Sequence, residues 1–212
     1  MELTPMEKIT IESYDKAAGF RKQSCTTKFF WQDMFERLKE YLPTGNVIDV
    51  GCGTGSDARM FIPIGYDYLG IDLSVPLLDV AKEVAPEADF RLMNLYNLAS
   101  EIESGFKDDE FDLVWAACSL IHVPKARIDD ALTGIKRVLK PKGFGFIAMR
   151  EGDGEQMVSD SQGSRFFSLY SLPQFANILA RNNFYVLDQS RDERGANKFS
   201  SGFLCYHVRN GK

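Results

Sequence analysis

The stretch that decides the fold is Val47-Ile48-Asp49-Val50-Gly51-Cys52-Gly53-Thr54-Gly55. It joins a short apolar run, typical of a buried strand, to a glycine-rich turn, and a helix is expected to follow over Asp57–Ile62. Glycines let a ligand approach the backbone closely, and the next helix presents free N–H groups and a positive dipole end. In an open α/β sheet such a turn lies beyond the carboxyl ends of the strands, where ligands bind. This stretch therefore predicts a ligand site.

An acidic side chain follows the second apolar run. Asp72 ends the stretch Tyr68-Leu69-Gly70-Ile71-Asp72, seventeen residues after Gly55. A carboxylate at this place can accept hydrogen bonds from the two hydroxyls of a ribose. The glycine turn and this acid together predict a cofactor that contains adenosine. The alternative is a structural turn in which Asp72 serves only as a helix-capping residue.

The spacing of the glycines distinguishes between adenosine cofactors. Dinucleotide sites need G-x-G-x-x-G, whereas here glycines stand at positions 51, 53 and 55 and Ser56 takes the place of the last one. Asp49 also puts an acid just before the turn, which is unfavourable beside a pyrophosphate and compatible with a cationic sulfonium. These two departures favour a sulfonium cofactor over NAD.

Strands and helices alternate on both sides of this motif. The expected strands are Asn46–Val50, Tyr68–Ile71, Phe90–Met93, Phe111–Trp115 and Phe144–Met149. Between them, helices are expected over Asp57–Ile62, Pro76–Val84 and Ile128–Leu139. Several of these strands are apolar on both faces, as in a parallel sheet covered by helices. The pattern predicts an α/β fold with a Rossmann-like, doubly wound sheet.

The flanks of this core carry further elements. Two helices, Met6–Ala18 and Phe29–Tyr41, are expected before it, with Phe29 and Trp31 as helix core. After it, Gly152–Gly163 is interpreted as a loop, and Leu172–Arg181 as a helix. The expected end is an antiparallel hairpin of Tyr185–Gln189 and Gly202–Val208 with a long polar loop. We therefore expect a seven-stranded sheet, mostly parallel, with an antiparallel C-terminal strand.

The bulk composition fits a single cytoplasmic domain. The expected parts of this domain, residues 1–212, are an N-terminal helical cap or lid (1–43), a cofactor-binding core (44–150) and a substrate-side loop, helix and hairpin (151–212). A net charge of −5 disfavours nucleic acid as a partner, and no apolar run is long enough to cross a membrane. The cysteines lie far apart, at Cys25, Cys52, Cys118 and Cys205. This scatter predicts buried, reduced thiols and no metal site.

At these residues the chain resembles the class I S-adenosylmethionine-dependent methyltransferases, and is most similar to the small-molecule group with a type 11 methyltransferase domain. The resemblance runs from Tyr14 to the C-terminus. It rests on the ordered segments Asp49–Gly55, Asp72-Leu73, Phe111–Ala116, Leu120–His122, Arg137–Gly143, Arg165–Phe167 and Ser171–Pro173. Two positions depart from the family pattern: Lys142 replaces a glycine, and Asn94 replaces a common aspartate.

The resemblance implies how S-adenosylmethionine would be held. The glycine loop would cradle its methionine part, Asp72 its ribose, and Leu73 would pack on the adenine. Asn94 would offer its side-chain oxygen to the adenine amino group. Arg21 is expected to pair with the methionine carboxylate. The full expected set is Tyr14, Arg21, Asp49, Gly51, Cys52, Gly53, Thr54, Gly55, Asp72, Leu73, Asn94, Leu95 and Ala116.

The expected reaction is in-line transfer of the methyl group to a small molecule, which leaves S-adenosylhomocysteine. Positioning contributes most of the catalysis in such a reaction, so no covalent nucleophile is needed. His122 is the candidate general base, because its intrinsic pKa lies near neutrality; the alternative is a histidine with a packing role. The expected substrate side comprises Cys118, Arg150, Arg165 and Phe167. The acceptor atom (O, N or C) stays open.

Two other functions compete with this one. The first is a nicotinamide-dependent oxidoreductase, against which the glycine spacing argues. The second is a non-catalytic, methyltransferase-like protein that binds the cofactor for regulation. The departure at Asn94 leaves room for this second function. Docking of a protein or RNA on the open face is a further alternative to a small acceptor.

Overall fold

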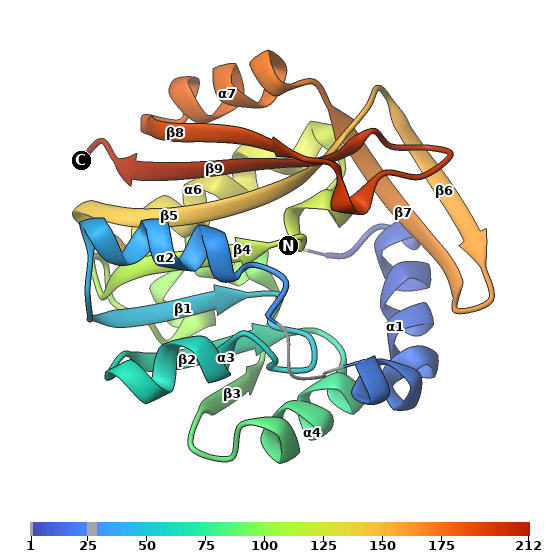
Figure 1. The fold of residues 1–212 in the computed structure, drawn as a ribbon, viewed down its shortest axis with the longest axis horizontal. Helices are drawn as coiled ribbons and strands as arrows, with labels where there is room; N and C mark the ends of the chain where they lie inside the picture. Colours follow the sequence, from blue (N-terminus) through green and yellow to red (C-terminus); the bar gives the residue numbers. More distant parts are fainter. Residues whose placement is uncertain (1, 25–28) are drawn as a thin grey trace.

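The computed structural model describes residues 2–24 and 29–212 (Figure 1). Its strands are β1 (Asn46–Val50), β2 (Asp67–Asp72), β3 (Asp89–Leu92), β4 (Phe111–Ala117), β5 (Leu139–Glu151), β6 (Glu155–Asp160), β7 (Gly163–Tyr170), β8 (Phe184–Asp192) and β9 (Gly202–Asn210). Its α-helices are α1 (Pro5–Ser24), α2 (Gln32–Tyr41), α3 (Ala58–Phe61), α4 (Val75–Val84), α5 (Glu101–Ser104), α6 (Ile128–Val138) and α7 (Leu172–Arg181). Short 3₁₀ helices are η1 (Ile62–Ile64), η2 (Leu95–Ala99), η3 (Leu120–His122), η4 (Lys125–Arg127) and η5 (Glu193–Gly195).

The strands described form one sheet. Strands β3, β2, β1, β4 and β5 lie side by side in that order, and all of their pairings are parallel. β9 joins β5 antiparallel, and β8 pairs with β9 at the far edge. The α/β, Rossmann-like fold and the antiparallel C-terminal strand expected from the sequence are thus confirmed.

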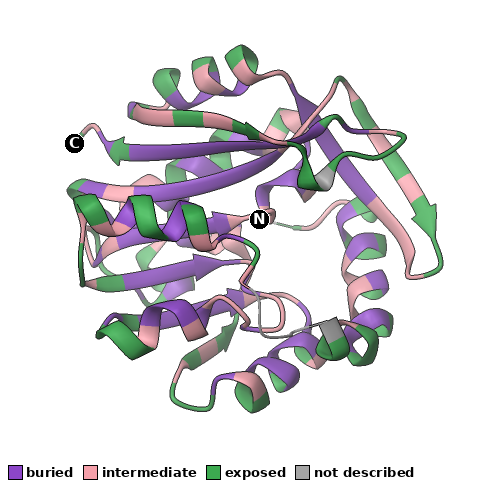
Figure 2. Ribbon diagram, in the orientation of Figure 1, coloured by how far each residue is buried: buried purple, intermediate pink, exposed green. Residues whose placement is uncertain are grey.

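Helices cover both faces of the sheet, and successive strand residues enter opposite cores (Figure 1). Val47 points into the cluster on the side of α2 and α3, whereas Ile48 points into the cluster on the side of α6. Phe146 and Ile147 of β5 divide in the same way. The central strands therefore lack a polar face, which explains their continuous apolar sequences. Figure 2 shows β1, β2, β4, β5 and β9 buried along most of their length, whereas β3, β6 and β8 are more exposed.

The expected loop at Gly152–Gly163 and the count of seven strands are wrong. The structure has a β-hairpin here, β6 and β7, and the hairpin meets the rest of the sheet only where β7 pairs with the end of β5, at Arg150↔Leu169 and Glu151↔Tyr170. The strand pattern is weak in sequence because β6 is mostly exposed and only the second half of β7 is buried. Its burial comes from tertiary contacts, above all with α1.

Helix α1 is longer than the expected Met6–Ala18 and lies against β7 across the open end of the sheet (Figure 1). Thr10 Oγ1 accepts from the backbone N–H of Phe166 at 2.9 Å, and Ser13 Oγ donates to the carbonyl of Ser164 at 2.7 Å. These side chains take the place of a neighbouring strand for β7. Two polar residues that would otherwise indicate a solvated helix face therefore form an interface.

The N-terminal end of α1 is fixed by a buried polar cluster. Glu7 accepts from the Tyr96 hydroxyl at 2.6 Å and pairs with Arg127 at 2.6 Å. Further along, the hydroxyl of Ser74, the residue before α4, donates to Asp15 at 2.6 Å. These contacts hold α1 as one wall of the space beyond the strands.

Smaller differences concern element ends and cysteines. α2 begins at Gln32 rather than at the expected residue 29, and the helix expected over Asp57–Ile62 is divided into α3 and η1. Cys52 and Cys205 are buried, Cys118 is half-buried, and all three are free, whereas Cys25 lies outside the described residues. Within residues 2–24 and 29–212, none of the helices combines the length and apolarity needed to cross a membrane.

Candidate active site

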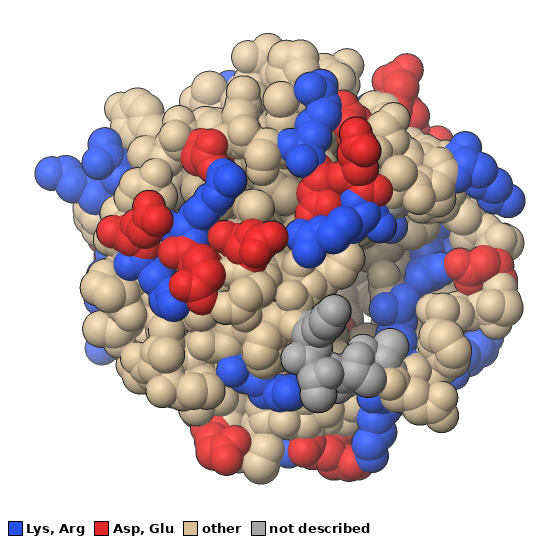
Figure 3. Space-filling view, viewed as in Figure 1, with Lys and Arg blue, Asp and Glu red and all other residues tan. Residues whose placement is uncertain are grey.

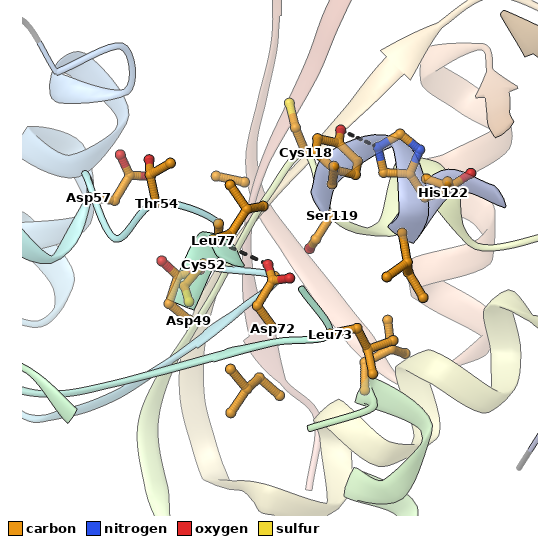
Figure 4. Close-up of a pocket in the computed structure, with 18 of the residues that line it drawn as sticks. Asp49, Cys52, Thr54, Asp57, Asp72, Leu73, Leu77, Cys118, Ser119 and His122 are labelled. Carbon is orange, nitrogen blue, oxygen red and sulfur yellow. Dashed lines mark hydrogen bonds between the residues drawn. The ribbon is translucent and has the colours of Figure 1, made fainter. Parts of the chain in front are cut away.

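A cavity of about 540 Å³ opens at the carboxyl ends of β1, β2 and β4, with α1 as its opposite wall (Figure 4). This volume is typical of sites for small molecules. The sequence-predicted residues that line it are Tyr14, Arg21, Asp49, Gly51, Cys52, Gly53, Thr54, Asp72, Leu73, Asn94, Leu95, Cys118 and His122. The structure therefore brings together most of the residues expected to hold a cofactor.

Two glycines of the loop differ in their surroundings: one is packed against another segment, and the other faces open space. Gly51 and Gly53 have φ angles of 78° and 54°, in the left-handed region that favours glycine. A Cβ at Gly51 would lie 2.3 Å from the Cβ of Ser119, so this glycine permits close packing of β1 on the segment after β4. A Cβ at Gly53 would meet nothing within 4 Å. The backbone at Gly53 therefore faces open space in the cavity, where a ligand can approach it.

Asp72 is held by the loop that it faces. Its two carboxylate oxygens accept from the backbone N–H groups of Gly53 and Ser74, each at 2.9 Å. Burial raises the pKa of Asp72, and these N–H bonds oppose the rise. The carboxylate is thus fixed between the glycine loop and the start of α4, with its remaining lone pairs available to a ligand.

Two more carboxylates lie under the same half of the cavity (Figure 4). Asp49 is buried and accepts from the Tyr68 hydroxyl at 2.6 Å. Burial raises the pKa of Asp49 well above its usual range, and the negative charge of Asp57 adds to this rise. Asp57 accepts from Trp115 Nε1 at 2.8 Å, and burial raises its pKa to about 6. A cation bound here would relieve the repulsion among these groups.

Asn94 has a structural role that its sequence position did not suggest. Its Oδ1 accepts from the backbone N–H of Tyr96 at 3.1 Å, and so caps η2. The same oxygen was expected to bind the adenine amino group. An adenine contact would therefore share this oxygen with the cap. Leu73 and Leu95 line the cavity nearby and provide apolar walls.

On the other side of the cavity, His122 binds two partners. Its Nδ1 lies 2.5 Å from the carbonyl of Phe166, which only accepts, so Nδ1 carries the proton in the neutral ring. Its Nε2 is then the acceptor for the Tyr14 hydroxyl, at 2.7 Å. Burial, together with the charges of Arg165 and Arg21, lowers the pKa of His122 to about 4, and the bond to Phe166 opposes this fall. His122 is therefore neutral at pH 7.

Tyr14 connects this histidine to the basic side chains of the site. The Cζ of Arg21 lies 4.5 Å from the centre of the Tyr14 ring, and that of Arg165 lies 5.8 Å from it. Burial raises the pKa of Tyr14, while the charges of Arg21 and Arg165 lower it in part. The expected contact of Tyr14 with a cofactor is thus accompanied by a bond to the candidate base.

Some expected site residues lie away from the cavity wall. Ala116 is fully buried in the core, and its neighbour Ala117 lines the cavity instead. Gly55 packs against Phe90: a Cβ added at Gly55 would lie 2.8 Å from a carbon of the Phe90 ring. Neither residue lines the cavity, and their expected contacts with a cofactor stay predictions. The expected substrate-side residues Arg150, Arg165 and Phe167 lie behind the Tyr14–His122 pair, where Phe167 and His122 have ring centres 4.9 Å apart.

Sequence reasoning missed several residues of the wall. They are Leu3, Glu7, Thr10 and Ile11 of the N-terminal segment, Ser56 and Asp57 after the glycine loop, Tyr96, Ser119 and Val123, and the aromatic run Phe29–Trp31. Asp57 could have been found, because it follows the glycine loop directly. Phe29 and Trp31, expected in the core of a helix, precede α2 and reach the cavity. The contribution of α1 had no local signal.

The sheet order, the glycine loop and the acid after β2 define a class of protein, the class I S-adenosylmethionine-dependent methyltransferase domains. Residues 47–143 match the family described as methyltransferase domain. The uncharacterized protein MJ1123 of Methanocaldococcus jannaschii is 30% identical over 161 residues, which cover 73% of this chain and 70% of that protein. The chain belongs to the methyltransferase domain family.

Other similarities extend to proteins with named activities. The chain is 30% identical over 158 residues to phosphoethanolamine N-methyltransferase 2 of Caenorhabditis elegans, covering 71% of the chain but only 35% of that enzyme. The chain thus spans about a third of this curated relative. A crystal structure of Burkholderia thailandensis 1,6-didemethyltoxoflavin-N1-methyltransferase, with 1,6-didemethyltoxoflavin and S-adenosylhomocysteine bound, has a TM-score of 0.74 at 20% identity. The alignment covers 100% of this chain and 92% of that one, and it shows a common fold.

Proposed function

We propose that this protein transfers the methyl group of S-adenosylmethionine to a small molecule and releases S-adenosylhomocysteine. The observation that carries the proposal is the open backbone at Gly53 beside the fixed carboxylate of Asp72, within one cavity of about 540 Å³. Family membership supports the same chemistry. A nicotinamide cofactor finds less support, because a pyrophosphate would meet the buried acids Asp49 and Asp57.

The residues present fit the proposed cofactor. The Ser119 Oγ is buried at the cavity wall without a hydrogen-bond partner among the described residues, so it is available to a polar ligand. The carboxylates of Asp49, Asp57 and Asp72 suit a ligand with cationic groups. When bound, the sulfonium supplies an activated methyl group. The protein then has to hold the acceptor in line with that group and exclude water.

The acceptor end of the cavity lies at Tyr14 and His122. An acceptor O–H or N–H that binds Tyr14 Oη can pass its proton to this oxygen while Tyr14 gives its own proton to His122 Nε2. With that proton on the imidazole, the acceptor atom would be ready to receive the methyl group that the cofactor would supply. In this scheme Tyr14 is the residue in contact with substrate, and His122 acts through it. This revises the expectation that His122 itself contacts the acceptor.

The remaining features of the site support a small acceptor. α1 closes the space beyond the carboxyl ends of the strands, and β7 of the β6–β7 hairpin packs against α1. In this proposal residues 1–43 form the cap of the core, and residues 151–212 form its substrate side. Phosphoethanolamine N-methyltransferase 2 and the 1,6-didemethyltoxoflavin-N1-methyltransferase are, by their names, N-methyltransferases of small molecules. The net charge of −5 argues against tracking along nucleic acid. The free thiols of Cys52, Cys118 and Cys205 support a cytoplasmic location.

The first experiment is calorimetry with S-adenosylmethionine and S-adenosylhomocysteine, followed by an acceptor screen that detects S-adenosylhomocysteine release. A folded protein that binds neither nucleoside would refute the proposal, and binding without turnover across a broad screen would favour a regulatory protein. With an acceptor in hand, Tyr14→Phe and His122→Gln should each lower kcat by roughly 10²–10⁴. The double variant should be no slower than either single one. Tyr185→Phe, at an exposed tyrosine of β8, is the matched control.

A further inference from the structure

We propose that Asp15 is a positioning residue, whose hydrogen bond from Ser74 links cofactor binding to the Tyr14–His122 pair. The inference rests on the proposed methyl transfer and adds how the same site is regulated. It starts from two consecutive residues of α1. The Tyr14 hydroxyl contacts His122 Nε2 at 2.7 Å, and Asp15 accepts from the Ser74 hydroxyl at 2.6 Å.

These two contacts hold α1 from two sides of the cavity. Consecutive side chains of an α-helix point about 100° apart, so together they fix both the position of the helix and its rotation about its axis. His122 belongs to η3, which follows β4, whereas Ser74 precedes α4 and follows β2. Figure 1 shows α1 running between β7 and α4, and Figure 3 shows the hollow that α1 borders. A movement of α1 at Asp15 would therefore move Tyr14 relative to His122.

Ser74 connects Asp15 to the carboxylate that is proposed to hold the ribose. Its backbone N–H donates to Asp72 at 2.9 Å, and its hydroxyl donates to Asp15. Ser74 is buried, and the same hydroxyl accepts from the backbone N–H of Leu77 at the start of α4. A continuous chain of hydrogen bonds therefore leads from Asp72 to α1.

The charges at this joint determine how a cofactor would act on α1. Asp72 and Asp15 are carboxylates bonded to the same residue, and their like charges repel, which opposes the contact of α1 with Ser74. Burial raises the pKa of Asp72, and the charge of Asp15 adds to this rise. Ribose hydroxyls that donate to Asp72 would weaken the repulsion. A ligand that favours one position of α1 in this way increases the population of that position.

This link gives the reaction an order. With the cofactor bound, α1 holds Tyr14 at His122, and the acceptor meets a complete site. Without it, the same pair forms for a smaller part of the time, so activation of the acceptor follows cofactor binding. In this proposal the link runs through Asp15 and Ser74, and the other side chains of the acceptor side take no part in it.

Nitrogen NMR of the full-length protein with isotope-labelled histidine measures the Tyr14–His122 bond. The chain has two histidines, His122 and His207. The chemical shift of His122 Nε2 reports whether this atom accepts a hydrogen bond, and His207, whose Nε2 donates to the carbonyl of Met34 at 2.9 Å, is the internal reference. In the wild type, S-adenosylhomocysteine should move the His122 signal toward the bonded value. In Tyr14→Phe this movement should be lost.

Two substitutions of Asp15 distinguish the proposed role from a purely structural one. Asp15→Asn keeps an oxygen that accepts from Ser74 but removes the charge, so its His122 signal should lie at the bonded value before the nucleoside is added. Asp15→Ala lacks the acceptor, so S-adenosylhomocysteine should no longer move the signal to that value. Lys22→Gln is the matched control, because it removes an exposed ion pair with Glu83 between the same two helices and should behave as the wild type.

Calorimetry with S-adenosylhomocysteine separates this inference from the proposed function. Folded wild-type protein that does not bind the nucleoside refutes the proposed function, and this inference with it. Binding that leaves the wild-type His122 signal unchanged, or moves it equally in the wild type and in both Asp15 variants, refutes only the link through Asp15. The same holds if the movement persists in Tyr14→Phe. If Asp15→Ala does not fold, Asp15→Asn decides alone.

Discussion

The pH dependence of stability should change when His122 is replaced by glutamine. Burial and the nearby arginines lower the pKa of His122 from 6.5 to about 4. Between these two values the unfolded chain binds a proton at His122 that the folded protein does not. Stability from this group is therefore complete above pH 6.5 and is lost as pH falls toward 4. Glutamine does not titrate, so the His122→Gln variant lacks this loss.

The expected change in unfolding free energy follows from the difference between the folded and unfolded pKa values of His122. A shift of about 2.5 pKa units corresponds to roughly 3 kcal/mol at 1.36 kcal/mol per unit. Because the His122 side chain is not fully buried, we expect about 2–3 kcal/mol. At pH 8 the wild type should be the more stable protein, since glutamine replaces the bonds to Tyr14 and Phe166 incompletely. The difference in unfolding free energy in favour of the wild type should shrink by about 2–3 kcal/mol on going from pH 8 to pH 4.

Urea unfolding from pH 8 to pH 4 measures both proteins under the same conditions. His207 also has a lowered pKa, through burial, but it is present in both proteins and cancels in the difference. If the difference in unfolding free energy is constant across this range, His122 titrates alike in both states. The Tyr14–His122 contact would then be absent in solution, and the proton path through Tyr14 would lose its basis.

Three further variants test the cofactor side and α1. Asp72→Ala should weaken S-adenosylhomocysteine binding at least tenfold, because hydrogen bonds to a carboxylate contribute roughly 1.5–3 kcal/mol; an unchanged dissociation constant in calorimetry would place the ribose elsewhere. Gly53→Ala should fold at a cost of about 1–2 kcal/mol for its positive φ yet bind the cofactor poorly, whereas Gly51→Ala, whose Cβ would lie 2.3 Å from another carbon, should fail to fold. Tight cofactor binding by Gly53→Ala would contradict the assigned open backbone. Glu7→Gln should lower the unfolding free energy by about 3–5 kcal/mol, because it breaks the buried pair with Arg127; a loss below about 1 kcal/mol in urea would show that this pair does not hold α1.

The cofactor half of the site could be predicted because its determinants are local. The strand, the turn and the acid at Asp72 lie close together in sequence, and Gly51, Gly53 and Asp72 each have a backbone reason for their identity. Gly51 allows close packing on Ser119, and Asp72 accepts a hydrogen bond from the backbone N–H of Gly53. Strands with continuous apolar sequences also predict a parallel sheet covered by helices on both faces. A local motif therefore carries both the fold and the position of the site.

The hairpin and the role of α1 could not be predicted because their stability comes from each other. β7 is buried by α1, and the bonds from Thr10 and Ser13 join side chains of one element to the backbone of the other. In sequence, Thr10 and Ser13 indicate only a polar helix face, and the glycines near residue 152 indicate a loop. No periodicity records a contact between segments about 150 residues apart. The pairing of Tyr14 with His122 is hidden for the same reason.

The origin of the charges suggests that the two halves of the cavity can change independently. The carboxylates of Asp49, Asp57 and Asp72 belong to β1, β2 and the loop between them, so they move with the backbone that would hold the cofactor. The side chains around Tyr14 and His122, such as Arg21 and Arg165, come from α1 and β7 and share no backbone with that loop. Substitutions on this side can therefore change the acceptor while the affinity for S-adenosylhomocysteine stays the same. A methyltransferase domain built in this way keeps one cofactor and changes its substrate through residues that no single motif contains.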